Sequence, residues 1–228
     1  MKPFIGIMER PEKTRGQNAV TVMYDDVRTV VISCGGIPIG IVPTSTTSYV
    51  DKKASDVPVL TDEEKKDLNC LLALCSGVIF PGGDEVMDYD LYALDYCYKN
   101  QIPTLGICMG MQAMGVYFDG YLKEIHTSNH HRQNKQSYAH TVKLDKNSKL
   151  YQILQKETFQ VNSFHKYMVK DIKKVHVVAI ASDDVIEALE DQNHPFFIGV
   201  QWHPETLFTY DMMSQKLFKH FFEIIKKR

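Results

Sequence analysis

The stretch Gly106-Ile-Cys-Met-Gly-Met-Gln112 continues the apolar run 102–107 and leads into a helix-like segment. It predicts a strand, a sharp turn and a helix, with Cys108 at the turn. The glycines at 106 and 110 are the small residues that a strained elbow requires. A cysteine at this point faces the partial positive charge of a helix N-terminus, which favours the thiolate. On these residues alone, a buried structural cysteine in an ordinary turn is the alternative.

Strand and helix patterns alternate through the first half of the chain. The predicted strands cover 4–8, 37–42, 78–80 and 103–107, and the predicted helices cover 24–34, 61–74 and 91–99. Thr61 and Glu64 form the capping-box pattern that begins the second helix. Polar stretches predict loops at 9–18 and 44–59. This alternation favours a parallel sheet with helices on both faces and sites at the carboxyl ends of the strands.

The second half has more strand character. The predicted strands cover 141–144, 175–181, 185–190 and 196–202, and a helix follows from about Tyr210. Asp183 and Asp184 would form the turn of a hairpin between the second and third of these strands. We find no repeat or linker and therefore assign residues 1–228 to one α/β domain, with an antiparallel portion added to the parallel sheet.

The composition is that of an ordinary globular chain of 228 residues, with 44% hydrophobic and 24% charged residues. A net charge of −2 gives no basis for binding nucleic acid or an anionic membrane. No apolar segment is long enough to span a bilayer, and we expect no secretory signal. The five scattered cysteines lack a Cys-x-x-Cys pair, which indicates free thiols and predicts a cytoplasmic protein.

His203 and Glu205 follow the last predicted strand and are separated by a proline. Side chains at positions i and i+2 of an extended segment point the same way, so the carboxylate can hold the imidazole in one tautomer. With Cys108 they would form the nucleophile, base and orienting group of an acyl-transfer enzyme. The loop Pro81-Gly-Gly-Asp84 follows another strand, and its glycines allow backbone N–H groups to point at a ligand. A surface turn at each place is the alternative.

Taken together, these stretches resemble the class I glutamine amidotransferase superfamily, and within it the peptidase C26, γ-glutamyl-γ-aminobutyrate hydrolase-like branch. The resemblance runs over nearly the whole chain and is specific because five motifs occur in the family's order. The motifs are Phe80-Pro-Gly-Gly83, Leu105-Gly-Ile-Cys-Met-Gly-Met-Gln112, Val161-Asn-Ser-Phe-His165, Ile186-Glu-Ala-Leu-Glu190 and Gly199-Val-Gln-Trp-His-Pro-Glu205.

The resemblance implies a flavodoxin-like fold and a hydrolase that cleaves γ-glutamyl amide bonds through a γ-glutamyl thioester. It makes Cys108 the nucleophile, His203 the general base and Glu205 its orienting residue. It places the oxyanion hole at the backbone amides of Gly83 and Met109. It also implies a substrate-binding set, without metal or organic cofactor. That set is Gln112, Asn162, Ser163 and His165.

The chain departs from the family pattern in three places. Met109 stands where the hydrolase branch usually has arginine, the stretch after Gly83 is short, and Asp184 replaces a common turn glycine. With these changes, the sequence does not determine which amine is released from a small γ-glutamyl substrate. It also does not determine whether the chain forms a homodimer. Two other functions are carried forward. One is a glutaminase subunit that supplies ammonia to a partner synthase, and the other is a degenerate member that only binds a ligand.

Four histidines are concentrated in one polar stretch, at positions 126, 130, 131 and 140. A zinc site is one interpretation, but no cysteine or carboxylate stands near them at ligand spacing. We therefore expect a solvated loop that includes Thr127–Asn129. The family resemblance implies a structural role for His140 or a place at the edge of the site. Trp202 is expected in the core beside the strand that leads to His203.

Overall fold

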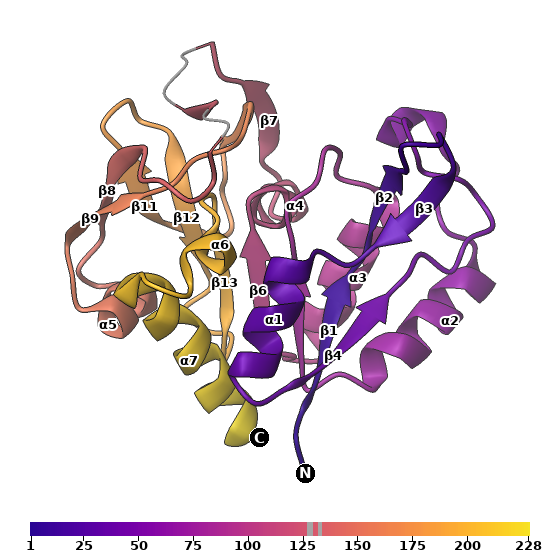
Figure 1. Cartoon of the computed structure of the whole chain (residues 1–228), viewed down its shortest axis with the longest axis horizontal. Coiled ribbons are helices and arrows are strands. Elements are labelled where there is room, and N and C mark those ends of the chain that lie inside the picture. Colours follow the sequence, from indigo (N-terminus) through magenta and orange to yellow (C-terminus); the bar gives the residue numbers. More distant parts are fainter. Residues whose placement is uncertain (127–129, 132–133) are drawn as a thin grey trace.

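The computed structural model describes residues 1–126, 130–131 and 134–228, and its largest feature is a nine-stranded sheet (Figure 1). The strands of the chain are β1 (Phe4–Met8), β2 (Arg10–Lys13), β3 (Ala19–Val22), β4 (Ile37–Ile41), β5 (Gly77–Phe80), β6 (Thr104–Ile107), β7 (Tyr121–Glu124), β8 (His140–Leu144), β9 (Thr158–Val161), β10 (Tyr167–Lys170), β11 (His176–Ala181), β12 (Ile186–Glu190) and β13 (Phe197–Val200). The order across the large sheet is β4-β1-β5-β6-β13-β12-β11-β8-β9.

This sheet has two differently built halves. The five strands β4, β1, β5, β6 and β13 run parallel to one another. From β13 onward, each pairing through β12, β11, β8 and β9 is antiparallel. Strands β5, β6 and β13 are buried along their whole length, as is expected of parallel strands covered on both faces. The predicted α/β fold, a mainly parallel sheet with an antiparallel portion, is confirmed.

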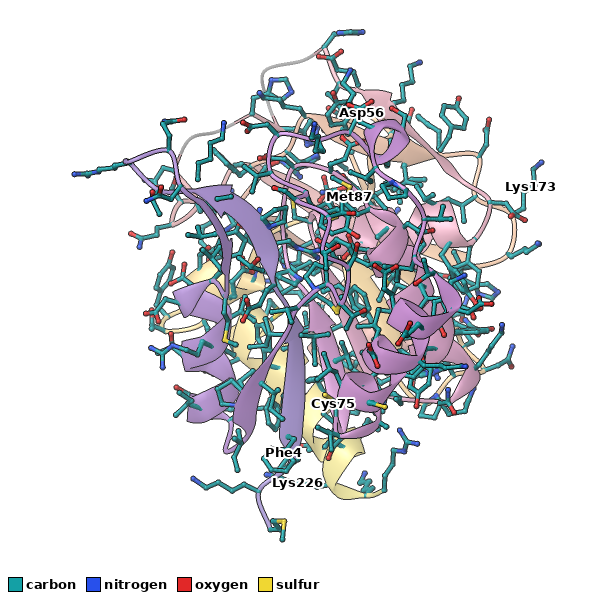
Figure 2. All side chains as sticks on the ribbon, turned by 90° about the vertical axis from the view of Figure 1, so that its right-hand side faces the viewer. Phe4, Asp56, Cys75, Met87, Lys173 and Lys226 are labelled. Atoms are coloured by element: carbon teal, nitrogen blue, oxygen red, sulfur yellow. The ribbon has the colours of Figure 1, made fainter. Side chains whose placement is uncertain are left out.

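Helices cover both faces of the sheet. They are α1 (Asp25–Ser33), α2 (Asp62–Ala73), α3 (Asp88–Lys99), α4 (Met109–Tyr117), α5 (Lys149–Leu154), α6 (Pro204–Leu207) and α7 (Met212–Lys226), with a short 3₁₀ turn η1 (Ala54–Asp56). One apolar cluster contains side chains from α1, α5 and α7, and a second contains side chains from α2, α3 and α4. Figure 2 shows Met87 inside the molecule and Lys173 extending from its edge.

The parallel half brings the three motif loops together. Strand β6 lies between β5 and β13, and each of these strands is followed at its carboxyl end by one loop. The loops begin at Pro81 after β5, at Cys108 after β6 and at Gln201 after β13. Because neighbouring parallel strands end at the same edge, the three loops meet there.

Several local predictions are confirmed. Thr61 caps α2, since its hydroxyl accepts from the N–H of Glu64 at 3.3 Å while the Glu64 carboxylate accepts from the N–H of Thr61 at 2.7 Å. Strands β11 and β12 pair as the predicted hairpin, and Asp184 in its turn has a φ of 61°. Trp202 is buried in the core as expected.

Two other expectations were wrong or incomplete. Residues 9–18 were expected to be a loop, but β2 pairs with β3 as a separate antiparallel hairpin. The β2 sequence Arg-Pro-Glu-Lys has no apolar alternation, so it gave no strand signal. Elements β7, α5, β9 and β10 also lacked a clear signal. The expected loop Thr127–Asn129 lies outside the described residues.

Within the described ranges, the structure contains no helix that is both long and apolar enough to cross a membrane.

Candidate active site

Cys108 sits on a strained backbone elbow between β6 and α4. Its φ of 52° and ψ of −108° are unusual for a residue with a side chain. A Cβ on Gly106 would lie 2.8 Å from the backbone carbon of Gly110, and a Cβ on Gly110 would lie 1.9 Å from the carbonyl oxygen of Phe80. The two glycines are therefore required by close backbone approach, and the predicted elbow is present.

His203 and Glu205 are joined beside Cys108. His203 Nδ1 lies 2.7 Å from Glu205 Oε1, and both side chains are largely buried. Burial alone disfavours the charged imidazole, but the negative charges of Glu205 and of a Cys108 thiolate outweigh it and raise the pKa of His203 to about 10. His203 Nε2 makes no conventional hydrogen bond to the described residues, which leaves it open toward Cys108. This arrangement can hold a thiolate and an imidazolium together.

Arg10, a residue that sequence reasoning missed, holds the loop after β5 by hydrogen bonds. The Arg10 guanidinium donates through Nε to the carbonyl of Gly82 and through Nη2 to the carbonyl of Pro81, both at 3.1 Å. Its Nη1 lies 2.6 Å from Asp90 Oδ1, and both side chains are buried. These bonds hold the backbone that carries Gly83. Arg10 and Asp90 stand 80 positions apart and follow no motif, so no sequence pattern indicates this pair.

Gly83 and Met109, the predicted oxyanion-hole residues, lie side by side. A Cβ on Gly83 would lie 2.9 Å from Met109 Cε and 3.1 Å from Arg10 Cδ, so the space above this backbone is already filled. Met109 is the first residue of α4, and a helix leaves the N–H groups of its first turn without an internal partner. The N–H of Met109 is therefore free of an internal helix partner and is a candidate for anion binding, and the oxyanion-hole role of Gly83 and Met109 stays a prediction.

A pocket of about 700 Å³ opens over Cys108. Its lining includes the three predicted catalytic side chains and Gly83, together with Gln112 and His165. Gln112 donates to the carbonyl of Tyr167 at 2.9 Å and to Gln201 Oε1 at 3.2 Å. Burial lowers the pKa of His165 to about 3, so this imidazole is neutral. A substrate-binding role for Gln112 and His165 stays a prediction.

Asn162 and Ser163, predicted in the same substrate-binding set, have partners within the protein. The Asn162 amide accepts from the N–H of His203 at 2.9 Å and donates to the carbonyl of His203 at 3.0 Å. Ser163 Oγ donates to the carbonyl of His130 at 3.0 Å. Both side chains are buried and neither lines the pocket of Cys108. Asn162 is thus built to hold the backbone of His203, and substrate contact by either residue stays untested.

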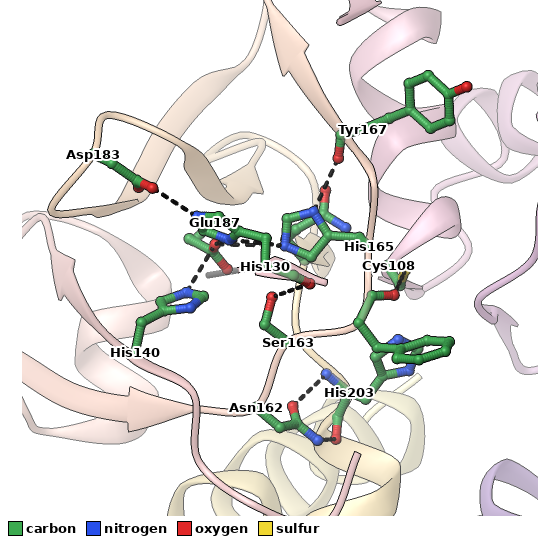
Figure 3. Close-up of polar contacts among 12 residues, drawn as sticks. Cys108, His130, His140, Asn162, Ser163, His165, Tyr167, Asp183, Glu187 and His203 are labelled. Atoms are coloured by element: carbon green, nitrogen blue, oxygen red, sulfur yellow. Dashed lines mark hydrogen bonds and ion pairs between the residues drawn. The ribbon is translucent and has the colours of Figure 1, made fainter. Parts of the chain in front are cut away.

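The histidine-rich stretch is not the uniform solvated loop that we expected. His126 and His131 are exposed, but His130 is only 1% exposed and lies beside His140, His165 and Glu187 (Figure 3). Sequence spacing failed here because the carboxylate comes from β12, which is distant in the chain. The expectation for His130 was therefore wrong, and the cluster is considered further below.

Comparison with known proteins places these motifs in a family. The family model described as Peptidase C26 matches residues 3–205. The chain belongs to the peptidase C26 family. The predicted resemblance is thereby confirmed, and the match together with hydrolases among the relatives supports a hydrolase enzyme.

Two relatives illustrate the range of similarity. The protein "Putative glutamine amidotransferase PB2B2.05" of Schizosaccharomyces pombe is 36% identical over 135 residues, which cover 56% of this chain. That match spans about half the length of the relative, 53%. The γ-glutamyl-γ-aminobutyrate hydrolase PuuD of Escherichia coli is 26% identical over 251 residues, covering 96% of this chain and 92% of PuuD.

Solved structures support the fold. The glutaminase domain of Trypanosoma brucei CTPS with bound acivicin matches with a TM-score of 0.66 and 16% identity, over 100% of this chain and 95% of that chain. At this level of identity the match establishes the class I glutamine amidotransferase fold alone. The activity of the present chain must be argued from the residues of its own site.

Proposed function

We propose that this protein hydrolyses γ-glutamyl amide bonds with Cys108 as nucleophile, through a γ-glutamyl thioester. The observation that carries the proposal is the buried pair of His203 and Glu205 beside a cysteine on a strained elbow. A thiolate and an imidazolium held in one pocket are the starting state of cysteine-dependent acyl transfer. The hydrolases among the family's members support the same class of reaction.

The reaction has two stages. The Cys108 thiolate attacks the γ-carbonyl carbon, and the electron pair of the C=O bond moves to oxygen, where the amides of Gly83 and Met109 donate to it. The intermediate then collapses, the C–N bond breaks, and His203 gives its proton to the leaving amine. Neutral His203 next takes a proton from water, which attacks the thioester and releases glutamate and the Cys108 thiolate.

The backbone amides would supply a large share of the rate. Each oxyanion donor is typically worth ~2.7–4 kcal/mol in the transition state. Arg10 matters to this step because its bonds to the carbonyls of Pro81 and Gly82 fix the peptide that leads into Gly83. Arg10 is thus a positioning residue for the proposed reaction.

The charges of the pocket suggest the nature of the leaving group. Four carboxylates from β2, the start of α1 and the loop after β5 line the pocket, and they outnumber the two lysines of its lining, Lys135 and Lys166. The four are Glu12, Asp25, Asp26 and Asp84. Burial raises the pKa of the Tyr24 hydroxyl, and Glu12 and Asp84 raise it further, whereas the charge of Arg10 lowers it. A wall with this excess of negative charge favours a cationic amine. We therefore propose that the leaving amine carries a positive charge.

The test is turnover of a matched substrate panel. Purified protein and Cys108→Ala would be incubated with glutamine, with γ-glutamyl diamines and with γ-glutamyl amino acids, and glutamate and free amine would be followed by mass spectrometry. We expect Cys108-dependent release of amines, fastest for the cationic ones. Asp84→Asn should reduce that preference, whereas Asp62→Asn, an exposed acid outside the pocket, should not.

Other outcomes would select the other functions. Ammonia release that requires an added protein would replace the proposal with a partner-dependent glutaminase. No turnover, combined with Cys108 labelling by iodoacetamide no faster than that of exposed Cys70, would indicate a degenerate binding protein.

A further inference from the structure

A second polar cluster lies behind the wall of the pocket. His130 and Glu187 are almost completely buried, and His140 at the start of β8 is half-buried (Figure 3). One possible ligand atom from each of these three side chains lies within 4.8 Å of the other two. The residues come from the segment before β8, from β8 itself and from β12, so the fold has gathered them from three places.

Hydrogen bonds to Asp183 and Tyr167 determine which nitrogen carries the hydrogen in the rings of His130 and His165. His130 Nε2 lies 2.9 Å from Asp183 Oδ2, and a carboxylate can only accept, so this nitrogen carries the hydrogen. His165 Nδ1 donates to the carbonyl of Tyr167 at 3.0 Å. The remaining nitrogens, His130 Nδ1 and His165 Nε2, then present lone pairs to each other at 3.3 Å. Two lone pairs at this distance repel unless a positive species stands next to them.

Glu187 brings a carboxyl group to the same point. Its Oε1 is 3.5 Å from His130 Nδ1 and 3.0 Å from His140 Nε2. The side chain is 0% exposed, and its Oε2 has no hydrogen-bond partner among the residues that the structure describes. A buried carboxylate is costly unless a cation or several donors compensate it.

The spacing and the atom types fit a metal ion. A tetrahedral zinc site with bonds of ~2.0–2.1 Å keeps its ligand atoms ~3.3–3.5 Å apart. Glu187 Oε1 lies 3.5 Å and 3.0 Å from the two imidazole nitrogens, and all three atoms lie within 4.8 Å of one another. Two imidazoles with one carboxylate are ligands that Zn²⁺ accepts. Asp183 bonds the outer nitrogen of His130, which is the arrangement that orients a metal-bound histidine.

We propose that His130, His140 and Glu187 bind one divalent transition metal ion of the zinc class, with Asp183 as the outer carboxylate. The site would act as a structural support. The carbonyl of His130 accepts from Ser163 Oγ and from the N–H of His165, both at 3.0 Å. These bonds hold the segment that carries Phe164, whose carbonyl lies 3.9 Å from Cys108 Sγ.

The test measures binding by the full chain after chelator treatment and dialysis. Zn²⁺ would be titrated, bound metal would be counted by mass spectrometry, and Co²⁺ would report coordination through its visible absorption. We expect one Zn²⁺ per chain, a tetrahedral Co²⁺ spectrum and a rise in melting temperature on metal addition. Zinc-dependent stabilisation is required because a bound metal stabilises the state that holds it.

Variants separate this site from incidental binding by surface histidines. Glu187→Gln should weaken Zn²⁺ binding by at least 100-fold, and Asp183→Asn, which is partly exposed and less disruptive, should weaken it by ~10–100-fold. The double variant His126→Ala/His131→Ala removes exposed histidines of the same stretch and should bind like the wild type.

Two results would overturn the proposal. One is that the wild-type protein binds no more Zn²⁺ than the Asp183→Asn variant does. The other is binding that disappears in the His126→Ala/His131→Ala variant but persists in Asp183→Asn. In the first case a proton shared by His130, His165 and Glu187 is the occupant, which imidazole nitrogen NMR would show directly.

Discussion

The two halves of the large sheet build their polar clusters in different ways. In the parallel half, the elbow at Cys108 is defined by backbone contacts that only glycine permits, and the two glycines stand two positions on either side of Cys108, although Gly110 also approaches Phe80 of β5. In the antiparallel half, the cluster of His130 and Glu187 is defined by side-chain contacts between distant segments. Glycines required by close backbone approach therefore leave a local sequence signal, whereas side-chain convergence across strands does not.

The largest effect is expected from breaking the backbone-defined half. Gly110→Ala would place a Cβ 1.9 Å from the carbonyl oxygen of Phe80, so the elbow or the end of β5 must move. Overpacking of this kind costs up to ~3 kcal/mol or more of unfolding free energy, and we expect hydrolysis to be abolished. Urea unfolding and substrate turnover would measure both effects.

Gly16→Ala is the matched control, because the nearest atom to its new Cβ would be 3.8 Å away. Gly110→Ala with normal turnover would show that the elbow tolerates displacement and would remove the central contrast between the two halves.

The next largest effect is expected from changing Glu205, whose charge raises the pKa of His203. Glu205→Gln removes the largest charge that raises the pKa of His203, and we expect turnover to fall by ~10²–10⁴-fold, the usual contribution of general acid–base catalysis. The imidazolium needed to protonate the leaving amine persists up to about pH 10 in the wild type. The alkaline limb of the pH–rate profile should therefore move to lower pH in the variant.

The free energy of unfolding should also fall as the pH rises through the pKa of His203. Because the folded-state pKa of His203 lies above the ordinary value of 6.5, its contribution to stability is complete below pH 6.5 and is lost as the pH rises toward about 10. Glu205→Gln should flatten this part of the stability profile, and Glu63→Gln on exposed α2 should leave it unchanged. Identical alkaline limbs in wild type and Glu205→Gln would argue against the assigned role of His203.

The sequence predicted the elbow and the triad because each depends on short spacing. Cys108 lies two residues from each glycine, and His203 lies two residues from Glu205, so strand geometry and turn chemistry suggest each part. The resemblance to a known family joined the two parts into one predicted triad. The support of Arg10 could not be predicted, since its partner Asp90 comes from a separate helix. The β2–β3 hairpin was missed for a related reason: its polar strand carries no periodic apolar pattern.

A moderate effect is expected from this unpredicted support. Arg10→Met leaves Asp90 buried without its cation, and breaking such a pair typically costs ~3–5 kcal/mol. The loop that carries Gly83 would also lose two hydrogen bonds, so turnover should fall by up to ~10²-fold. Thermal unfolding and turnover at saturating substrate would measure these losses.

The control is Lys99→Met, which breaks an exposed pair with Asp95 on α3 and should cost at most ~1 kcal/mol. Equal destabilisation by Arg10→Met and Lys99→Met would show that the buried pair is not a special support of the loop.

The smallest effect tests how the antiparallel half contributes to the triad. Asn162, at the end of β9, bonds both the N–H and the carbonyl of His203. If it positions His203, Asn162→Ala should lower kcat by ~10-fold and leave KM nearly unchanged, since only the alignment of the base is disturbed. If it binds substrate as the family resemblance implies, KM should rise instead. Ser163→Ala, which loses only a bond to the carbonyl of His130, should change kcat less than Asn162→Ala does. The kcat effect would join the two halves through Asn162, because a side chain of the antiparallel half would then set the position of the base that follows β13.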